Sequence, residues 1–316
     1  MEIFNQELSD RNEVRESYVE AISKSKNIEF TEEYMLPTKE NKDCDYRNCQ
    51  FGEVVSPEGK EETLKILSFF KDVFSKNSLD IGSHRGVKVA LHFDDQKCIK
   101  EPERFFSLEK REHLVRLVEE LEEAGIVELY TEDYPVKAVS NVVMIKKNEG
   151  RTKAEKFLNK MKKEKEDPVW RMTIDARNLN NALINVPLTT VPMIDHILQK
   201  VRGKIVSQMD FTQAFFSLEV TDESKPYLCF HVNGQVYTFN RLLQGLKSSP
   251  AIFIMTANET FSDGSLRRIK RIAPEEIRKE LDQFDTFDSF LQIYVDDIFI
   301  YSENESQHRA HLWAVL

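Results

Sequence analysis

Two adjacent carboxylates lie between two short apolar stretches near the end of the chain. Asp296 and Asp297 separate the β-prone runs 290–293 and 298–301. Such flanks predict the two strands of a hairpin, with the acidic pair at its turn. Neighbouring carboxylates repel each other unless a cation joins them, and hard oxygen ligands suit Mg²⁺ or Mn²⁺. The pair therefore indicates a metal site, for which a solvated acidic surface turn is the alternative.

A third carboxylate ends another expected strand. The run 204–210 is β-prone and closes with Asp210, and the chain then turns away through 211–216. If the strands lie side by side, Asp210 meets Asp296 and Asp297. Three carboxylates around two ions about 3.5 to 4 Å apart clamp the attacking and leaving oxygens of phosphoryl transfer. The arrangement predicts nucleotidyl transfer.

Four motifs in sequence order connect this chemistry to a known family. They are 170–180 (WRMTIDARNLN), 209–216 (MDFTQAFF), 243–253 (LQGLKSSPAIF) and 294–297 (YVDD). The first looks like the fingers motif, and the other three closely resemble the core motifs, of retroviral and gypsy-like LTR-retrotransposon reverse transcriptases. The resemblance runs from about Leu64 to the C-terminus. It implies an RNA-directed DNA polymerase, a nucleotidyltransferase of a retrotransposon Pol polyprotein.

The fold that the resemblance implies is α/β (α+β), the fingers and palm of a right-hand polymerase, with an antiparallel palm sheet backed by helices. The expected divisions are a polar, flexible N-terminal segment (1–60), a leader (61–107), fingers (108–184) and palm (185–316). Three further segments are expected: a lengthened fingers hairpin tip (148–168), a part returning to the fingers (218–248) and a charged insertion in the palm (262–288). Because the sequence stops at Leu316 inside an expected helix, the thumb is expected to be absent.

The family also implies a catalytic metal centre. Asp210 and Asp296 would hold two Mg²⁺ ions, with Mn²⁺ as the alternative ion. Asp297 would complete the catalytic triad, and the backbone carbonyl of Phe211 would be a further ligand. One metal would lower the pKa of the primer 3′-hydroxyl, and the other would stabilise the leaving pyrophosphate.

Contacts to the incoming nucleotide follow from the same resemblance. Phe215 occupies the position of an aromatic gate that excludes a 2′-hydroxyl; a core aromatic is the alternative. Ala214 and Gln244 are expected beside the nucleotide, Gln244 near its sugar. Arg171 would lie over the triphosphate, since a planar guanidinium binds phosphate oxygens bidentately. A buried structural arginine is the alternative for Arg171.

Template and primer contacts are expected at Arg177, Gly245, Tyr294 and Val295. A glycine at position 245 allows the backbone to turn close to substrate or template. Arg177 and Asp175 would project from the same face of a strand, since side chains alternate along it. Whether Arg177 contacts the template or forms a salt bridge within the fingers stays open at this point.

Lysines and arginines gather between residues 146 and 171, although the net charge of the 316-residue chain is −10. This stretch is a candidate phosphate-facing surface, and a solvated helix of mixed charge over 153–165 is the alternative. The family places a triphosphate-binding lysine near the fingers tip. The lengthened tip leaves Lys163, Lys165 and Lys147 as candidates.

Apolar spacing predicts helices over 64–74 and over 108–124, the second with Ser107 as N-cap and Gly125 as stop. The resemblance implies a helix from 250 past 261, and further helices are expected, one at the surface within the charged segment 262–288 and one over the last residues to 316. Strands are expected over 139–147 and, as its partner, 169–176. Cys44, Cys49, Cys98 and Cys229 lack zinc spacing, which predicts reduced structural thiols.

The sequence therefore predicts a polymerase domain that takes an RNA or DNA template with primer and a dNTP, in company with other Pol segments such as a thumb, ribonuclease H or integrase. No apolar stretch approaches 18 residues and the start lacks a signal-peptide pattern. A cytoplasmic location is expected, with the nucleus or virus-like particles as alternatives. Two other functions stay open: an inactive or co-opted remnant that binds nucleic acid, and a viral RNA-dependent RNA polymerase, which Phe215 and Gln244-Gly245 argue against.

Overall fold

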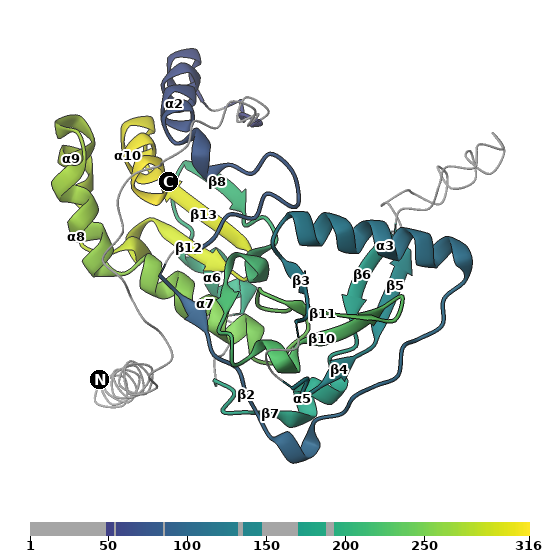
Figure 1. Cartoon of the computed structure of the whole chain (residues 1–316). Helices are drawn as coiled ribbons and strands as arrows, with labels where there is room; N and C mark the ends of the chain where they lie inside the picture. The colour runs from purple at the N-terminus through teal and green to yellow at the C-terminus, as the bar shows by residue number, and fades with distance from the viewer. Residues whose placement is uncertain (1–48, 54, 85, 132–134, 147–169, 188–192) are drawn as a thin grey trace, which may run out of the picture. The chain divides into compact units, whose positions relative to one another are not determined.

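The computed structural model describes residues 49–316 apart from 54, 85, 132–134, 147–169 and 188–192 (Figure 1). The chain forms two compact units. The first contains the chain up to Val89, Val186–Glu219 and Lys247–Leu316, and the second contains Ala90–Asn185 and Val220–Leu246. Most of the segment 1–60 lies outside the described residues. So do the tip 148–168, its expected helix, and Lys147, Lys163 and Lys165.

A three-stranded antiparallel sheet carries the acidic residues of the first unit. Its order is β12 (Leu291–Tyr294), β13 (Asp297–Ser302), β8 (Ile205–Asp210). The predicted hairpin and the strand that ends at Asp210 are both confirmed. β13 pairs along its whole length with β8, from Asp297 opposite Asp210 to Ser302 opposite Ile205.

The two faces of this sheet differ because side chains alternate along a strand. In β8 every second residue from Val206 to Asp210 is exposed, and the residues between them are half-buried. On the buried side, Met209 packs against a core cluster. Its fully buried large members are Leu266, Leu281, Phe290 and Ile300. The apolar face thus anchors the strands and leaves the carboxylate end accessible.

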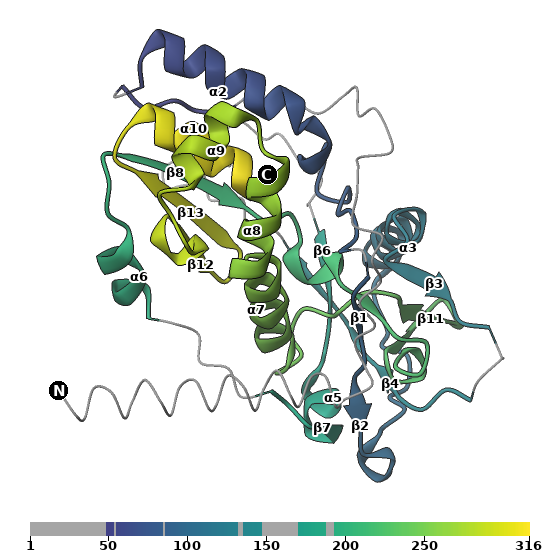
Figure 2. The ribbon, with the colours of Figure 1, turned by 90° about the vertical axis from the view of Figure 1, so that its left-hand side faces the viewer.

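Helices surround this sheet in the first unit. They are α2 (Pro57–Phe69), α6 (Ile194–Lys200), α7 (Ser249–Thr260), α8 (Asp263–Ile272), α9 (Glu275–Leu281) and α10 (Glu305–Val315), with short 3₁₀ turns η2 (Lys71–Val73), η4 (Ala214–Ser217) and η6 (Phe287–Ser289). α10 packs against β13, α9 and α2 (Figure 2). The expected helices at 250–261 and at the end of the chain are confirmed.

Pro57 begins α2, because proline fits the first helical position and Ser56 caps the helix by accepting a hydrogen bond from Gly59 N. One local expectation in this unit is wrong. The insertion 262–288 holds two helices rather than one. α8 ends at Ile272 with Ala273 as its C-cap, because Pro274 cannot continue a helix, and α9 follows.

The second unit is built on a four-stranded sheet and two small two-stranded sheets. The sheet order is β3 (Val127–Leu129), β11 (Gln235–Phe239), β10 (Cys229–Val232), β4 (Val139–Ser140). β5 (Val142–Lys146) pairs with β6 (Trp170–Ile174), and β2 (His92–Phe93) pairs with β7 (Leu183–Ile184), both antiparallel. The two short strands β1 (Lys88–Val89) and β9 (Glu219–Val220) lie where the chain passes between the units.

Two helices, α3 (Leu108–Glu123) and α5 (Arg177–Ala182), and the 3₁₀ turns η3 (Asp95–Lys97) and η5 (Lys225–Tyr227) complete the second unit. α3 confirms the expected helix, and Gly125 follows it with φ 67°. Ser107 precedes α3 without a side-chain capping bond. The expected strand 139–147 is divided at Asn141, whose carbonyl accepts a hydrogen bond from Asp175 N at 2.9 Å.

The β10–β11 hairpin was not foreseen, although the sequence carries its signal. Its loop is Asn233-Gly234, with φ 52° and 76°, and an Asn-Gly pair favours the two-residue turn with both φ positive.

Cys229, in β10, is a free thiol, and burial raises its pKa to about 12. Among the described helices, none is long and apolar enough to cross a membrane.

Candidate active site

The β12–β13 turn holds the acidic pair in a strained loop. Tyr294 is opposite Asp297, so only Val295 and Asp296 lie in the loop. Val295 has φ 53°. Tight hairpins use a positive φ at the first loop position, where glycine is the usual residue, and a β-branched side chain there is a genuine outlier. Such outliers cost about 1 to 3 kcal/mol and cluster at functional sites.

Strand pairing gathers the three aspartates at one end of this sheet. Asp297 and Asp210 are register partners on β13 and β8. Phe211 N donates a hydrogen bond to the carbonyl of Asp296 at 2.9 Å, which ties the turn to the end of β8. The expected meeting of Asp210 with the acidic pair is therefore found in the first unit.

Asp296 is in an unfavourable electrostatic position. Burial raises the pKa of its carboxyl, and the neighbouring charges of Asp210 and Asp297 raise it further. Its Oδ1 atom is buried and accepts no hydrogen bond from the described residues. A carboxylate oxygen that is buried, unpaired and beside like charges gains most from a cation.

Asp297 is held differently, by a residue that the sequence gave no reason to single out. Gln208, exposed on β8, donates from Nε2 to Asp297 Oδ1 at 2.9 Å. Within the described residues no three His, Cys, Asp or Glu side chains form a ready-made metal cage. The carboxylates nevertheless fit Mg²⁺, because this ion binds proteins through one or two carboxylates and completes its shell with water and substrate phosphates.

Phe215 is positioned by a helix that lies behind it. Gln213, with φ 50°, turns the chain after β8 into η4, which contains the buried Ala214 and half-buried Phe215. The ring of Phe253 on α7 packs edge-to-face against the rings of Phe215 and Phe211. The distances between ring centroids are 5.9 Å and 5.3 Å, respectively. Phe253 is 5% exposed. It lies in the third motif, but sequence reasoning gave it no role.

Comparisons with known proteins agree with this geometry. Residues 161–316 match the family model described as "Reverse transcriptase (RNA-dependent DNA polymerase)". The chain belongs to the reverse transcriptase family. The enzymatic polyprotein of cauliflower mosaic virus (strain CM-1841) is 25% identical over 261 residues, which are 81% of this chain and 32% of that polyprotein. The Pol polyprotein of the Drosophila melanogaster transposon gypsy is 30% identical over 152 residues, 48% of this chain and 12% of the polyprotein.

Solved structures show the reverse transcriptase fold. The foamy viral protease-reverse transcriptase in complex with dsDNA superposes with a TM-score of 0.57 at 18% identity, over 83% of this chain and 44% of that one. The native prototype foamy virus protease-reverse transcriptase gives a TM-score of 0.59 at 16% identity, over 83% of this chain and 29% of that one. The α/β fold of polymerase fingers and palm is therefore confirmed. The chain spans about a third of the length of the cauliflower mosaic virus relatives.

Arg171, Arg177, Gln244 and Gly245 lie in the second unit. Arg171 is exposed on β6, opposite Ile145, which rules out a buried structural arginine. Gln244 is exposed, and Gly245 has φ 96°. Asn180 Nδ2 donates to the Gly245 carbonyl at 2.9 Å and so joins this turn to α5. The glycine is required because an L side chain is strained at that φ.

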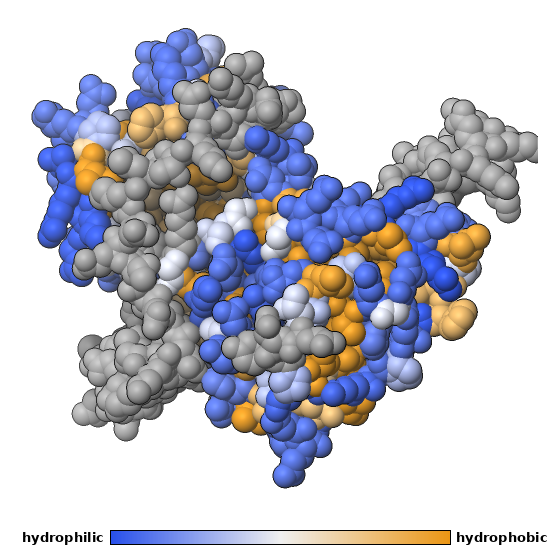
Figure 3. Space-filling view, in the orientation of Figure 1, coloured by the Kyte–Doolittle hydropathy of each residue, from blue (hydrophilic) through white to orange (hydrophobic). Residues whose placement is uncertain are grey.

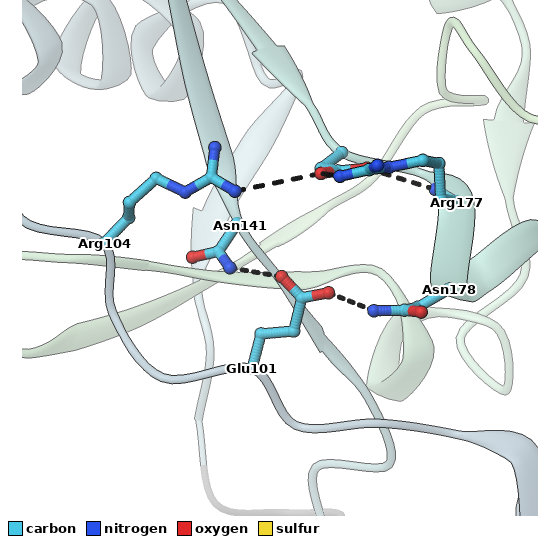
Figure 4. A network of polar contacts seen from close by, with 6 residues as sticks. Glu101, Arg104, Asn141, Arg177 and Asn178 are labelled. Atoms are coloured by element: carbon cyan, nitrogen blue, oxygen red, sulfur yellow. Dashed lines mark hydrogen bonds and ion pairs between the residues drawn. The ribbon is translucent and has the colours of Figure 1, made fainter.

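Arg177 forms the salt bridge that the sequence left open. It begins α5 instead of continuing a strand, since β6 ends at Ile174. Its Nε and Nη2 donate to the two oxygens of Asp175 at 2.8 and 2.6 Å, and Arg104 lies 3.9 Å from the same carboxylate (Figure 4). The hydrogen bond from Arg177 lowers the pKa of Asp175.

A second acidic residue, Glu101, forms a neighbouring set of hydrogen bonds (Figure 4). The Glu101 carboxylate accepts hydrogen bonds from the amides of Asn141 and Asn178 (Figure 4). It thereby connects the segment before α3 to the break between β4 and β5 and to the first turn of α5. Arg177 remains 84% exposed. A guanidinium that is fixed yet open to solvent can bind a further anion.

Proposed function

We propose that this domain is an RNA-directed DNA polymerase that adds dNTPs to a primer 3′-hydroxyl. The observation that carries the proposal is the meeting of Asp210, Asp296 and Asp297, with the unpaired Asp296 Oδ1, in a chain of the reverse transcriptase family. Template, primer and dNTP are the proposed substrates. In support, relatives of the same fold are described in complex with dsDNA and with an RNA/DNA hybrid.

Two divalent ions, Mg²⁺ or Mn²⁺, are the proposed cofactors, held by Asp210, Asp296, Asp297 and the carbonyl of Phe211. When bound, they activate the attacking hydroxyl and neutralise the leaving pyrophosphate. The chain itself contributes by holding the carboxylates in position. The strained turn at Val295 fixes Asp296, and Gln208 orients Asp297 through its amide. Positioning and charge stabilisation supply most of the catalysis in phosphoryl transfer.

The nucleotide is proposed to lie against Ala214 and Phe215, with Gln244 near its sugar and Arg171 on its triphosphate. The Phe215 ring would exclude a 2′-hydroxyl. The ring of Phe253, whose centroid lies 5.9 Å from that of Phe215, would hold the Phe215 ring in place. Arg177, Gly245, Tyr294 and Val295 are proposed to contact template and primer. The exposed Arg177 guanidinium, oriented by Asp175, supports a phosphate contact there.

The domain is proposed to act with other segments of a longer Pol polyprotein, in the cytoplasm, the nucleus or virus-like particles. The division into leader, fingers and palm at residues 61, 108 and 185, with a fingers return at 218–248, remains a proposal as well. Support for the polyprotein comes from the cauliflower mosaic virus relatives, which are about three times as long as the matched stretch.

Primer extension on poly(rA) with oligo(dT) tests the proposed activity. With Mg²⁺ or Mn²⁺, the chain is expected to incorporate dTTP and to reject UTP. Asp296→Asn should reduce incorporation by at least about 10²-fold, since it removes charge that binds metal and stabilises the transition state. Circular dichroism and thermal melting of both proteins check that the fold is unchanged.

Two results would contradict the proposal. Equal incorporation by the wild type and Asp296→Asn would show that the aspartates are not the catalytic centre. Binding of template–primer without any incorporation by the folded chain would favour a nucleic-acid-binding role instead.

A further inference from the structure

The helix α8 carries a strongly basic surface that the polymerase chemistry does not use. Arg267, Arg268 and Arg271 are all exposed, and they are here named the arginine face. The outer surface of α8 and α9 is largely hydrophilic (Figures 1 and 3). α8 lies in the segment 262–288, which the sequence marks as an insertion between the third motif and the catalytic hairpin.

The opposite side of α8 fixes the arginine face in place. Leu266 and Ala273 are 0% and 2% exposed and belong to the core cluster, and Ile269 packs against it. These residues follow each other at helical spacing, so the arginines between them must point outward. Lys270 is used internally, because its Nζ donates to the carbonyl of Phe284 at 2.6 Å. The arginine face is thus rigidly mounted on the same core that supports β12 and β13.

Among the described residues, no acid forms an ion pair with the arginine face. Its guanidinium groups make one hydrogen bond there, from Arg268 Nη2 to Ser265 Oγ at 3.1 Å. The acid at the start of α9, Glu275, is already paired with Lys279 at 3.0 Å. Like charges three and four residues apart weaken a helix. Arg271 therefore repels Arg267 and Arg268, and a bound polyanion would relieve that repulsion.

We propose that the arginine face binds the phosphate backbone of the template–primer duplex, outside the active site. Arg267 and Arg271 are four residues apart, about 6 Å along the helix axis. Phosphates follow each other about every 3.4 Å of axis on one strand, so this span covers neighbouring phosphates. Guanidinium groups bind phosphates bidentately and need no particular base sequence. The proposal rests on the proposed function for the identity of its ligand.

Salt-dependent binding of the full chain tests this surface. The probes are a 30-base-pair DNA duplex and an RNA/DNA hybrid of the same sequence, followed by fluorescence anisotropy at several salt concentrations. Arg267→Gln/Arg268→Gln/Arg271→Gln is compared with Lys65→Gln/Lys76→Gln/Lys279→Gln. The two variants lose the same charge, but the lysines are exposed at separate places of the first unit.

The arginine variant is expected to bind about tenfold or more weakly at 100 mM salt, with a slope of log K against log[salt] less steep by about 2 to 3. The lysine variant should keep the slope of the wild type. Equal losses of affinity in both variants would show that only the net charge of the chain matters, and would overturn the proposal. An unchanged arginine variant would overturn it too, and would point to an acidic protein as the partner of α8.

The outcome is separable from that of the proposed function. Asp296→Asn should bind both probes as the wild type does and still fail in primer extension. If Asp296→Asn behaves so while the arginine variant binds normally, only the role of the arginine face is wrong. If the wild type binds neither probe, both proposals fail.

Discussion

At the scale of single residues, the site combines strain with unsatisfied charge. Val295 is held at φ 53°, and Asp296 beside it has a raised pKa and a buried oxygen that accepts no hydrogen bond from the described part of the chain. Neither condition stabilises the free protein. Both are expected where a turn must present a carboxylate to a cation, since strained backbone persists only when its surroundings impose it.

Val295→Gly should therefore separate stability from activity. Glycine adopts a positive φ without strain, although it adds entropy to the unfolded chain, so unfolding free energy should stay equal or rise by up to about 1 kcal/mol. Primer extension should fall, because the turn no longer fixes Asp296. Val295→Ala keeps a Cβ at this φ and serves as control. A glycine variant with full activity would contradict a positioning role for the strained turn.

At the scale of elements, α7 supports the proposed sugar gate. Phe253 contacts both Phe211 and Phe215 edge-to-face, and such pairs contribute about 0.5 to 1.5 kcal/mol beyond their buried area. The sequence placed Phe215 at the gate but could not show what holds its ring. A gate that excludes one hydroxyl group must be rigid, so the supporting helix matters as much as the gate.

Phe253→Leu is expected to loosen Phe215 and to raise UTP incorporation relative to dTTP. The control is Phe287→Leu, a residue that is 3% exposed and pairs with Phe261 at 5.4 Å. Both variants should lose about 1 to 2 kcal/mol of stability, but only the first should change the choice of sugar. If both variants discriminate equally between dTTP and UTP, Phe253 contributes only to core packing.

At the scale of the whole molecule, two buried histidines should make the fold acid-sensitive. His308 lies between Ser207 and Ser302, at 2.7 and 2.9 Å, and His311 stacks on Phe290 at 4.0 Å. Burial lowers the pKa of both imidazoles to about 4. Both residues lie on α10 and join it to the sheet of the first unit.

The free energy of unfolding should consequently fall as the pH falls from about 6.5 to about 4. In that window the unfolded chain takes up protons that the folded chain refuses, which costs up to about 3 kcal/mol per imidazole. Below pH 4 the loss from these groups is complete. Urea titrations at several pH values measure it, with His308→Gln expected to flatten the curve and the exposed His196→Gln to leave it unchanged. A His308→Gln curve as steep as the wild type would contradict this account.

The sequence by itself determined the catalytic chemistry and its local setting. Aspartates between β-prone runs predicted the hairpin and the strand that meets it, because alternation and turn chemistry act over a few residues. The four motifs predicted the family and the polymerase fold. The helix α3 followed from apolar spacing, and a close backbone turn at Gly245 followed from the third motif.

Only the tertiary structure decided which partners those residues have. Gln208 orients Asp297 because two strands pair in one register, and Phe253 lies behind Phe215 because α7 packs there. Arg177 pairs with Asp175 since β6 gives way to α5 between them. The Gln208 and Phe253 contacts join residues through long-range pairing and packing, and no local pattern in the sequence records them. The pair of Arg177 with Asp175 is local, and the sequence left it as one of two alternatives.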